Sequence, residues 1–324
     1  MNKREEKRLA KSGKPIVKLH VLGAAGGVTG SLSLIEYQHE GRTARFLLDV
    51  GMHMENRRTD FENRMPKGVK ADQVDFIIMS HAHIDHSGYL PKFVKDGFKG
   101  KVYCTPATAD LVKILLPDSG YLQEEQAKRA NKRLAKNAAE KAARQPVKGK
   151  SPRGKQASVP NPDSADSALL APSRQPLYTQ KDAEASLSHL ATIDYDTRVE
   201  LAPGIAVTFT EAGHILGAAV VNLELGTGGY KKTLCFTGNI GRRNMALLRE
   251  LAPIHGADYL ITESTYGNKL HVKRDRLAEL ARIINEAHAR AKVRDSRKGY
   301  GVILIPAFAV GRVQVVLDDL RQLL

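Results

Sequence analysis

Residues 74–88 of the chain read VDFIIMSHAHIDHSG, and this stretch decides the fold and the chemistry that the sequence predicts. Residues 74–79 are mostly apolar and favour β structure, which is typical of a buried strand. The side chains of His81, His83, Asp85 and His86 follow directly. A strand end is a rigid support, so ligand-type side chains that begin there can be held in a fixed geometry.

The spacing of these four side chains favours a metal site. His81 and His83 point to the same side of an extended segment, because side chains alternate along it. Asp85 and His86 come after the chain has turned and can face the same pocket from another direction. Imidazole is a good zinc ligand, and a carboxylate beside it suits a second metal or a metal-bound water. The alternative is a polar loop that happens to be rich in histidine, but this density at a strand end argues against it.

Length and composition set the broad class. The chain has 324 residues, 42% of them hydrophobic, which is enough for one large domain or two ordinary ones with a buried core. The formal net charge of +15 and the pI of about 9.7 favour a polyanionic partner such as nucleic acid. The alternative is that much of this charge lies in flexible tails and only keeps the protein soluble.

Cysteine usage and hydropathy bear on the cellular location that the sequence predicts. Cys104 and Cys235 lie in or beside apolar strand-like runs, which predicts buried free thiols rather than a disulfide. No apolar run approaches the ~20 residues that a membrane helix needs. The basic N-terminus lacks the apolar run of a signal peptide. We therefore expect a cytoplasmic protein without a membrane partner.

The composition also changes along the chain. Residues 1–14 are rich in Lys, Arg and Glu, which predicts a disordered basic arm. Strand-like and helix-like segments alternate over 16–116, which points to a layered α/β architecture. A basic helix is expected over 121–144. Residues from about 145 to 175 shift to Pro, Ser, Gly, Ala and Lys and cannot bury enough apolar area to fold alone, so we expect a flexible insertion there.

Further candidate residues follow other predicted strands. Asp49 lies near the end of a strand over 44–50, where it can orient a ligating histidine or only cap a turn. His214 follows a strand over 205–210 and is bracketed by glycines, so a metal or a phosphate has room to approach it. Read alone, His214 is equally well a loop histidine; with the first cluster present, it is the natural further ligand. A buried strand is also expected over 302–305, before a final helix.

Six segments of the chain, taken in order, resemble the β-CASP branch of the metallo-β-lactamase superfamily. They read LGAAG, DVGM, HAHIDH, GHILG, ESTYG and IPAFAVGR, and begin at residues 22, 49, 81, 213, 263 and 305. Members of this branch are RNA-processing nucleases similar to the cleavage-and-polyadenylation endonuclease. The resemblance implies an α/β fold, namely a metallo-β-lactamase αββα sandwich with the start of an inserted α/β β-CASP domain. The implied boundaries are a basic arm over 1–14, a metallo-β-lactamase domain over 15–262 and a partial β-CASP domain over 263–324.

The resemblance also implies a mechanism and a set of site residues. The family consists of metal-dependent hydrolases that use two zinc ions to generate the hydroxide that attacks the phosphorus of RNA. One zinc would be held by His81, His83 and His214, and the other by Asp85 and His86. The resemblance further implies that Asp85 steers the nucleophile and that Glu263 orients a catalytic histidine. Asp49 would hydrogen-bond to the ligands without touching the metal, and Arg312 would bind phosphate.

Two departures from the family pattern bear on activity. Asn239 stands where the family has an aspartate that bridges both metal ions, and a neutral amide bridges two cations poorly, so the second zinc site should be weakened. Relatives continue beyond residues 305–312, and their continuation carries a general-acid histidine and a ligand of the second zinc. We therefore expect part of the core to be uncovered, which predicts either instability or a need for a partner, namely a second copy or a complementing chain.

Three functions remain open on the sequence alone. The first is a zinc-dependent, ribonuclease-type phosphodiester hydrolase that is impaired by Asn239 and by the missing C-terminal motifs. The second is a catalytically inactive RNA-binding or assembly subunit that retains the fold. The third is a small-molecule metallo-hydrolase of the lactamase or thioesterase kind, against which the basic charge and the motifs at 263–267 and 305–312 argue. DNA is a lesser variant of the substrate, because phosphate contacts alone do not distinguish it from RNA.

Overall fold

The computed structural model describes residues 14–54, 65–66, 68–144, 174–270, 274–293 and 302–324. The predicted basic arm over 1–14 and the predicted flexible insertion over about 145–175 lie almost entirely outside these residues.

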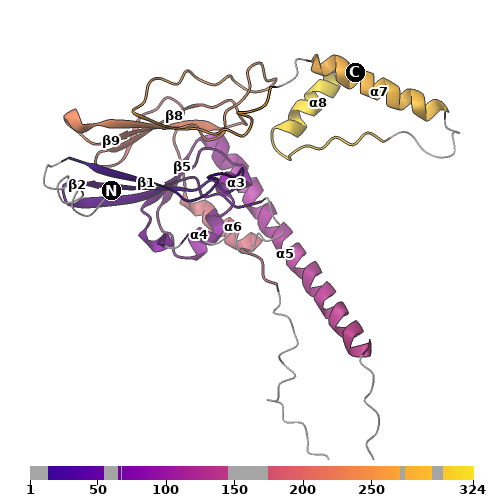
Figure 1. Ribbon diagram of the computed structural model, residues 1–324, viewed down its shortest axis with the longest axis horizontal. Helices are drawn as coiled ribbons and strands as arrows, with labels where there is room; N and C mark the ends of the chain where they lie inside the picture. The colour runs from indigo at the N-terminus through magenta and orange to yellow at the C-terminus, as the bar shows by residue number, and fades with distance from the viewer. Residues whose placement is uncertain (1–13, 55–64, 67, 145–173, 271–273, 294–301) are drawn as a thin grey trace, which may run out of the picture.

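Two β-sheets packed face to face form the centre of the molecule (Figure 1). In the first sheet, β1 to β3 are antiparallel, and β3 to β6 run parallel. In the second sheet, neighbours are antiparallel except for the parallel pair of β10 and β11. In spatial order, the first sheet contains β1 (Ile16–Val21), β2 (Ser33–His39), β3 (Arg42–Leu48), β4 (Phe76–Ile78), β5 (Lys101–Cys104) and β6 (Leu190–Thr192). The second contains β11 (Tyr259–Ile261), β10 (Lys232–Phe236), β9 (Ala219–Leu225), β8 (Ile205–Glu211) and β7 (Val199–Ala202).

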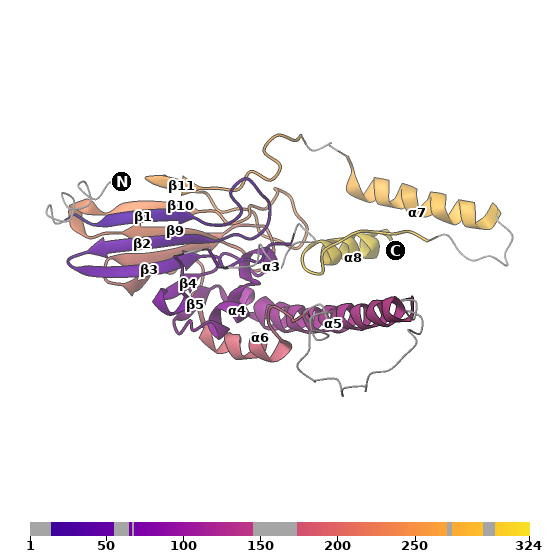
Figure 2. The same cartoon turned by 60° about the horizontal axis from the view of Figure 1, so that its bottom comes forward.

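Helices cover the face of the first sheet that points away from the second (Figure 2). They are α4 (Leu90–Lys95), α6 (Gln180–Ser186) and the first part of α5 (Pro106–Arg144), whose remainder extends beyond the body. The short helix α3 (Ile84–Ser87) lies at the end of the sheets, and α7 (Arg276–Val293) and α8 (Arg312–Leu323) lie beyond that end. Short 3-10 helices occupy Ala71–Gln73, Leu187–His189 and Gly228–Tyr230.

Alternation along the central strands produces two apolar cores. In β3, Phe46 and Leu48 pack in the core between the sheets, whereas Leu47 packs in the core under the helices. The second sheet contributes Phe209 and Val221 to the inter-sheet core. Burial on both faces is the rule for parallel strands that are covered by helices. The predicted α/β class with two packed sheets is therefore confirmed.

The two cysteines are also as expected. Cys104 and Cys235 are free and buried. Burial raises the pKa of the Cys104 thiol to about 12, so it stays protonated and packs as a small apolar group.

Two local predictions were wrong. The helix expected over 121–144 does not begin at residue 121 but continues a longer helix, α5, which begins at Pro106 and tolerates the loss of one amide donor at Pro117. Residues 302–305 do not form a strand, and Val302 and Leu304 are 82% and 86% exposed. None of the described strands pairs with this apolar run, so it has no sheet to join.

Apolar side chains are exposed on the strands at one pair of sheet edges. On β1, Leu19 and Val21 are exposed, and on β11, so are Tyr259 and Leu260. β1 and β11, the edge strands that carry these side chains, lie on the same side of the sandwich (Figure 2).

None of the described helices is both long and apolar enough to span a membrane.

Candidate metal centre

The predicted ligands lie on loops at one end of the sandwich, where strands of both sheets terminate. His81 and His83 follow β4 of the first sheet, and α3, which begins directly after His83, carries Asp85 and His86. His214 follows β8 of the second sheet. The packing of the two sheets therefore brings together side chains that are far apart in the sequence.

Three of the histidines form a compact cluster. One nitrogen from each of His81, His83 and His214 lies within 4.8 Å of the others. Nδ1 of His83 is 3.2 Å from Nε2 of His214. Nε2 of His81 and Nε2 of His83 are buried and have no hydrogen-bond partner among the described residues. Buried nitrogens without partners are costly, so this donor set fits a divalent cation that accepts their lone pairs.

The surroundings keep these imidazoles neutral. Burial lowers the pKa of His81 well below its usual value, and the neighbouring histidines add to this effect. Burial, with smaller contributions from His83, His86 and Arg312, lowers the pKa of His214 to about 3. Burial also lowers the pKa of His83, although Asp85 opposes it. A neutral imidazole offers the lone pair that metal binding requires.

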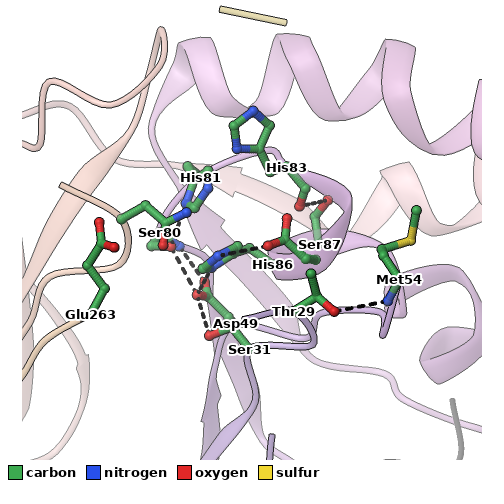
Figure 3. Close-up of polar contacts among 12 residues, drawn as sticks. Thr29, Ser31, Asp49, Met54, Ser80, His81, His83, His86, Ser87 and Glu263 are labelled. Carbon is green, nitrogen blue, oxygen red and sulfur yellow. Dashed lines mark hydrogen bonds and ion pairs between the residues drawn. The ribbon is translucent and has the colours of Figure 1, made fainter. Parts of the chain in front are cut away.

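Asp49 is a buried anchor for the other part of the site (Figure 3). Its carboxylate accepts hydrogen bonds from the Ser80 amide at 2.8 Å, the Ser80 hydroxyl at 3.0 Å and the Ser31 hydroxyl at 3.1 Å. Nδ1 of His86 lies 2.6 Å from Oδ2 of Asp49, so with the carboxylate as acceptor this nitrogen carries the proton. A carboxylate behind an imidazole is the arrangement that orients ligating histidines in metal sites.

The far side of the His86 ring faces Asp85. Nε2 of His86 is 3.6 Å from Oδ2 of Asp85, and the ring centroids of His86 and His81 are 4.0 Å apart. Burial lowers the pKa of His86, but Asp49 and Asp85 outweigh burial and raise it above the usual value. The structure thus places Asp85 and His86 beside the cluster of three histidines.

Backbone geometry fixes the position of Asp49. Its φ of +57° lies in the left-handed region, which costs free energy for a residue other than glycine and is commonly retained at functional sites. A Cβ on Gly51 would lie 1.7 Å from the carbonyl oxygen of Asp85, so only glycine allows this close approach. The amide of Val50 donates to the carbonyl of His86 at 2.9 Å. These contacts tie the Asp49 loop to α3.

Asn239 and Glu263 lie on the side of the second sheet. Nδ2 of Asn239 is 3.5 Å from Nε2 of His214, where an amide donor competes for the lone pair that a metal would use. Oε1 of Glu263 accepts a hydrogen bond from the amide of Ile240 at 2.8 Å and so supports the loop that carries Asn239. Glu263 forms no hydrogen bond with a histidine in the described part of the chain.

The loop before α8 lies over the histidines. The Phe308 ring centroid is 6.3 Å from that of His83, and the Arg312 guanidinium is 5.8 Å from the Phe308 ring centroid. The positive charge of Arg312 also contributes to the lowered pKa values of His83 and His214. Val310 packs against the helix-side core. This loop thus places the Arg312 guanidinium near the histidine cluster.

Sequence reasoning missed several contributors. Ser80 contacts both Asp49 and His81, and its place directly before the histidine motif was the only available signal. Ser31 could not be identified from the sequence, because it lies at a Gly-rich turn and such turns occur in many structural contexts. The contact of Phe308 with His83 depends on tertiary structure and could not be predicted from local sequence.

A family model described as a metallo-β-lactamase superfamily domain matches residues 39–229, which is more than half of the chain. The chain belongs to the metallo-β-lactamase superfamily. The matched range includes the histidine motif of the first sheet and His214 of the second.

Two kinds of curated relative are similar to most of this chain. Ribonuclease TTHA0252 of Thermus thermophilus is 29% identical over 298 residues, which covers 91% of this chain and 52% of the ribonuclease. Transcription termination factor FttA of Methanocaldococcus jannaschii is 29% identical over 282 residues, covering 86% of this chain and 36% of the factor. The chain therefore spans about half of the length of the ribonuclease and about a third of FttA. These relatives agree with the resemblance to the RNA-processing β-CASP branch.

Solved structures of metallo-β-lactamase fold proteins are also similar. The metallo-β-lactamase SMB-1 bound to 2-mercaptoethanesulfonate matches at 16% identity over 64% of this chain and 59% of its own, with a TM-score of 0.32. The metallo-β-lactamase fold protein YhfI of Bacillus subtilis matches at 16% identity over 69% of this chain and 62% of its own, with a TM-score of 0.33.

The cluster of three histidines yields a direct prediction for metal binding. Replacing His214 by alanine removes one of three converging imidazoles, and we expect the affinity for Zn²⁺ to fall by at least ~100-fold, the upper end of what even supporting residues cost. Titration against a chromophoric chelator measures this affinity. His20 is exposed, lies beside Glu36 and does not belong to the cluster, so His20→Ala should bind like the parent chain. Equal Zn²⁺ affinities of the His214→Ala and parent chains would show that the three histidines do not form the metal site.

Proposed function

We propose that this chain forms the metal-dependent part of an RNA phosphodiester hydrolase. The observation that carries the proposal is the convergence of three neutral imidazoles beside the carboxylate of Asp85. Two of them have buried nitrogens that find no hydrogen-bond partner among the residues that the structure describes. One relative is named a ribonuclease, and another a transcription termination factor. The net charge of +15 suits a polyanionic substrate.

The proposed roles follow from the placement of each side chain. His81, His83 and His214 would hold one zinc ion, and Asp85 and His86 would hold a second. Bound zinc would lower the pKa of a water molecule and stabilise the negative charge that develops on the phosphate.

The acidic residues have separate proposed roles. The Asp85 side chain is 22% exposed, so it can accept a hydrogen bond from an attacking water and orient it toward phosphorus. Asp49 would hold the His86 tautomer with Nδ1 protonated, which leaves Nε2 as the ligand atom. Glu263 would act through the Asn239 loop that it supports.

Arg312 is the proposed phosphate-binding residue. It is the first residue of α8, a helix of 12 residues, and its charge acts on His83 and His214. A guanidinium at a helix N-terminus combines two features that favour a phosphate group. We propose that residues 15–262 form the metallo-β-lactamase domain and that residues 263–324, which carry Arg312, begin the β-CASP domain.

An inactive RNA-binding or assembly subunit is the second candidate, and Asn239 is the observation that favours it. The amide lies 3.5 Å from Nε2 of His214, where a bridging carboxylate would neutralise two cations. Such a subunit would bind RNA without cleaving it. We also propose that the chain can bind DNA and that it pairs with a second copy or with a complementing chain.

The two candidates differ in the behaviour of an Asn239→Asp variant. Restoring a carboxylate should raise the affinity for a second Zn²⁺ by ~10–100-fold and increase cleavage of a labelled single-stranded RNA. Metal stoichiometry by mass spectrometry and RNA cleavage by gel electrophoresis measure the two effects. Asn244→Asp is the matched control, because Asn244 is exposed and has a φ of +57° that aspartate also tolerates.

The outcomes separate the candidates as follows. Zinc-dependent cleavage by the parent chain, enhanced in Asn239→Asp, supports the hydrolase. RNA binding without cleavage in both chains selects the inactive subunit. Turnover of a lactam or thioester with no effect on RNA would replace both candidates with a small-molecule hydrolase.

A second prediction concerns Arg312. Replacing it by alanine removes one phosphate-binding cation, so RNA affinity should fall by ~10-fold and the salt dependence of binding should decrease by about one ion. Fluorescence anisotropy at several salt concentrations measures both. Arg321 lies on the same helix, is exposed and pairs with Asp318, so Arg321→Ala is the matched control. Equal losses in the two variants would contradict a specific role for Arg312.

A further inference from the structure

A cavity of about 530 Å³ lies at the end of the sandwich opposite the histidines. Its walls include the first residues of the parallel strands β3, β4 and β5, whereas the histidines and Asp49 follow the last residues of β4 and β3. The turn between β7 and β8 closes the cavity on the side of the second sheet. The rise of the strands separates the two ends by about 15–20 Å. A pocket of this size can hold a small ligand.

Aromatic rings form part of the cavity wall. Tyr37, Phe76 and Tyr103 line it, and all three belong to or pack against the core between the sheets. The rings of Phe76 and Tyr103 meet edge to face with centroids 5.9 Å apart, and Phe76 also stacks on Phe46 at 4.7 Å. This packing fixes the wall in place. A rigid aromatic wall favours a flat aromatic ligand.

A buried polar group at the cavity has nothing to bind. Tyr37 is 3% exposed, and its hydroxyl has no hydrogen-bond partner in the described part of the chain. Burial and the nearby Glu40 raise the pKa of this phenol, so it remains a neutral donor. The hydroxyl passes close to Gly204, where an added Cβ would lie only 2.5 Å from it. Buried hydroxyls usually find a partner, which points to a ligand that supplies an acceptor.

Cations without partners surround the cavity. Arg42, Lys99 and Lys101 line it and are exposed, and none of them forms a side-chain ion pair or hydrogen bond with another described residue. Two carboxylates, those of Glu40 and Asp75, also line it, and Asp75 accepts a hydrogen bond from the Arg45 amide at 2.7 Å. His39 also lines the cavity, and its Nε2 lies 4.0 Å from Oε1 of Glu40. Both carboxylates therefore have a partner, whereas the three basic side chains have none among the described residues. This favours an anionic group on the ligand.

We infer that this cavity is a second binding site, separate from the metal centre, for a nucleotide: a flat base against the aromatic wall and a phosphate at the basic rim. Tyr37 would donate to the base or the sugar, and Arg42, Lys99 and Lys101 would bind the phosphate. The same chemistry is offered by a free mononucleotide and by the terminal nucleotide of an RNA chain. The inference does not depend on metal binding or on hydrolysis.

The test is calorimetric titration of the full chain with adenosine 5′-monophosphate. We expect saturable binding with one site, weakened at least ~10-fold in Lys99→Ala/Lys101→Ala because charge-assisted hydrogen bonds are lost. Tyr37→Phe should weaken binding by ~3–10-fold. This variant removes an unpartnered hydroxyl, so its melting temperature should not fall. Lys181→Ala, an exposed lysine on α6 away from the cavity, should bind like the parent chain.

Two further arms complete the test. His214→Ala should retain full nucleotide binding, which distinguishes this site from the metal centre whatever the outcome for hydrolysis. Competition by a 5′-phosphorylated oligoribonucleotide would assign the site to an RNA end, and absence of competition would assign it to a free nucleotide. The inference is overturned if the nucleotide does not bind, if both cavity variants bind as tightly as the parent, or if binding is lost in His214→Ala.

Discussion

The contact between His83 and His214 depends on the packing of two separate sheets. The two residues are 131 positions apart in the chain, yet Nδ1 of one lies 3.2 Å from Nε2 of the other. His83 follows a strand of the first sheet, and His214 follows a strand of the second. The apolar core between the sheets, which includes Phe46 and Phe209, holds the two sheets together. The amide of Ala219 in the second sheet also donates to the carbonyl of Ser80, directly before the histidine motif, at 2.8 Å. The site is thus a consequence of the fold rather than of a local motif.

Asp49 also fixes the geometry of the site, because it is hydrogen-bonded to the side of His86 that faces away from Asp85. A fully buried carboxylate is costly unless its oxygens are engaged, and Ser31, Ser80 and His86 engage them. The cluster is therefore anchored to three segments of the first half of the chain. This anchoring fixes the His86 ring, whereas burial keeps the pKa of His214 low at about 3. The fold thus keeps the three clustered histidines neutral and fixes the orientation of the His86 ring.

Much of this could be predicted from the sequence, because the strongest signals are local. The run of residues 74–79 followed by His81 and His83 indicated both a buried strand and a ligand cluster. The alternation of strand-like and helix-like segments over 16–116 indicated a layered α/β architecture, and the two packed sheets were implied by the family resemblance. The failures have physical reasons. The apolar residues 302–305 looked like a strand, but a strand needs a neighbour, and none of the described strands pairs with them. The hydrogen bond from Ile240 to Glu263 depends on how two loops meet, which local sequence does not encode.

If side chains of both sheets jointly hold a metal ion, its position can be observed in a crystal. A crystal of the full chain grown with Zn²⁺ would be examined by anomalous diffraction on both sides of the zinc absorption edge. We expect a zinc peak at ~2.0–2.1 Å from nitrogens of His81, His83 and His214. A zinc peak that contacts only the residues of one sheet, or no peak at these histidines at saturating Zn²⁺, would contradict it.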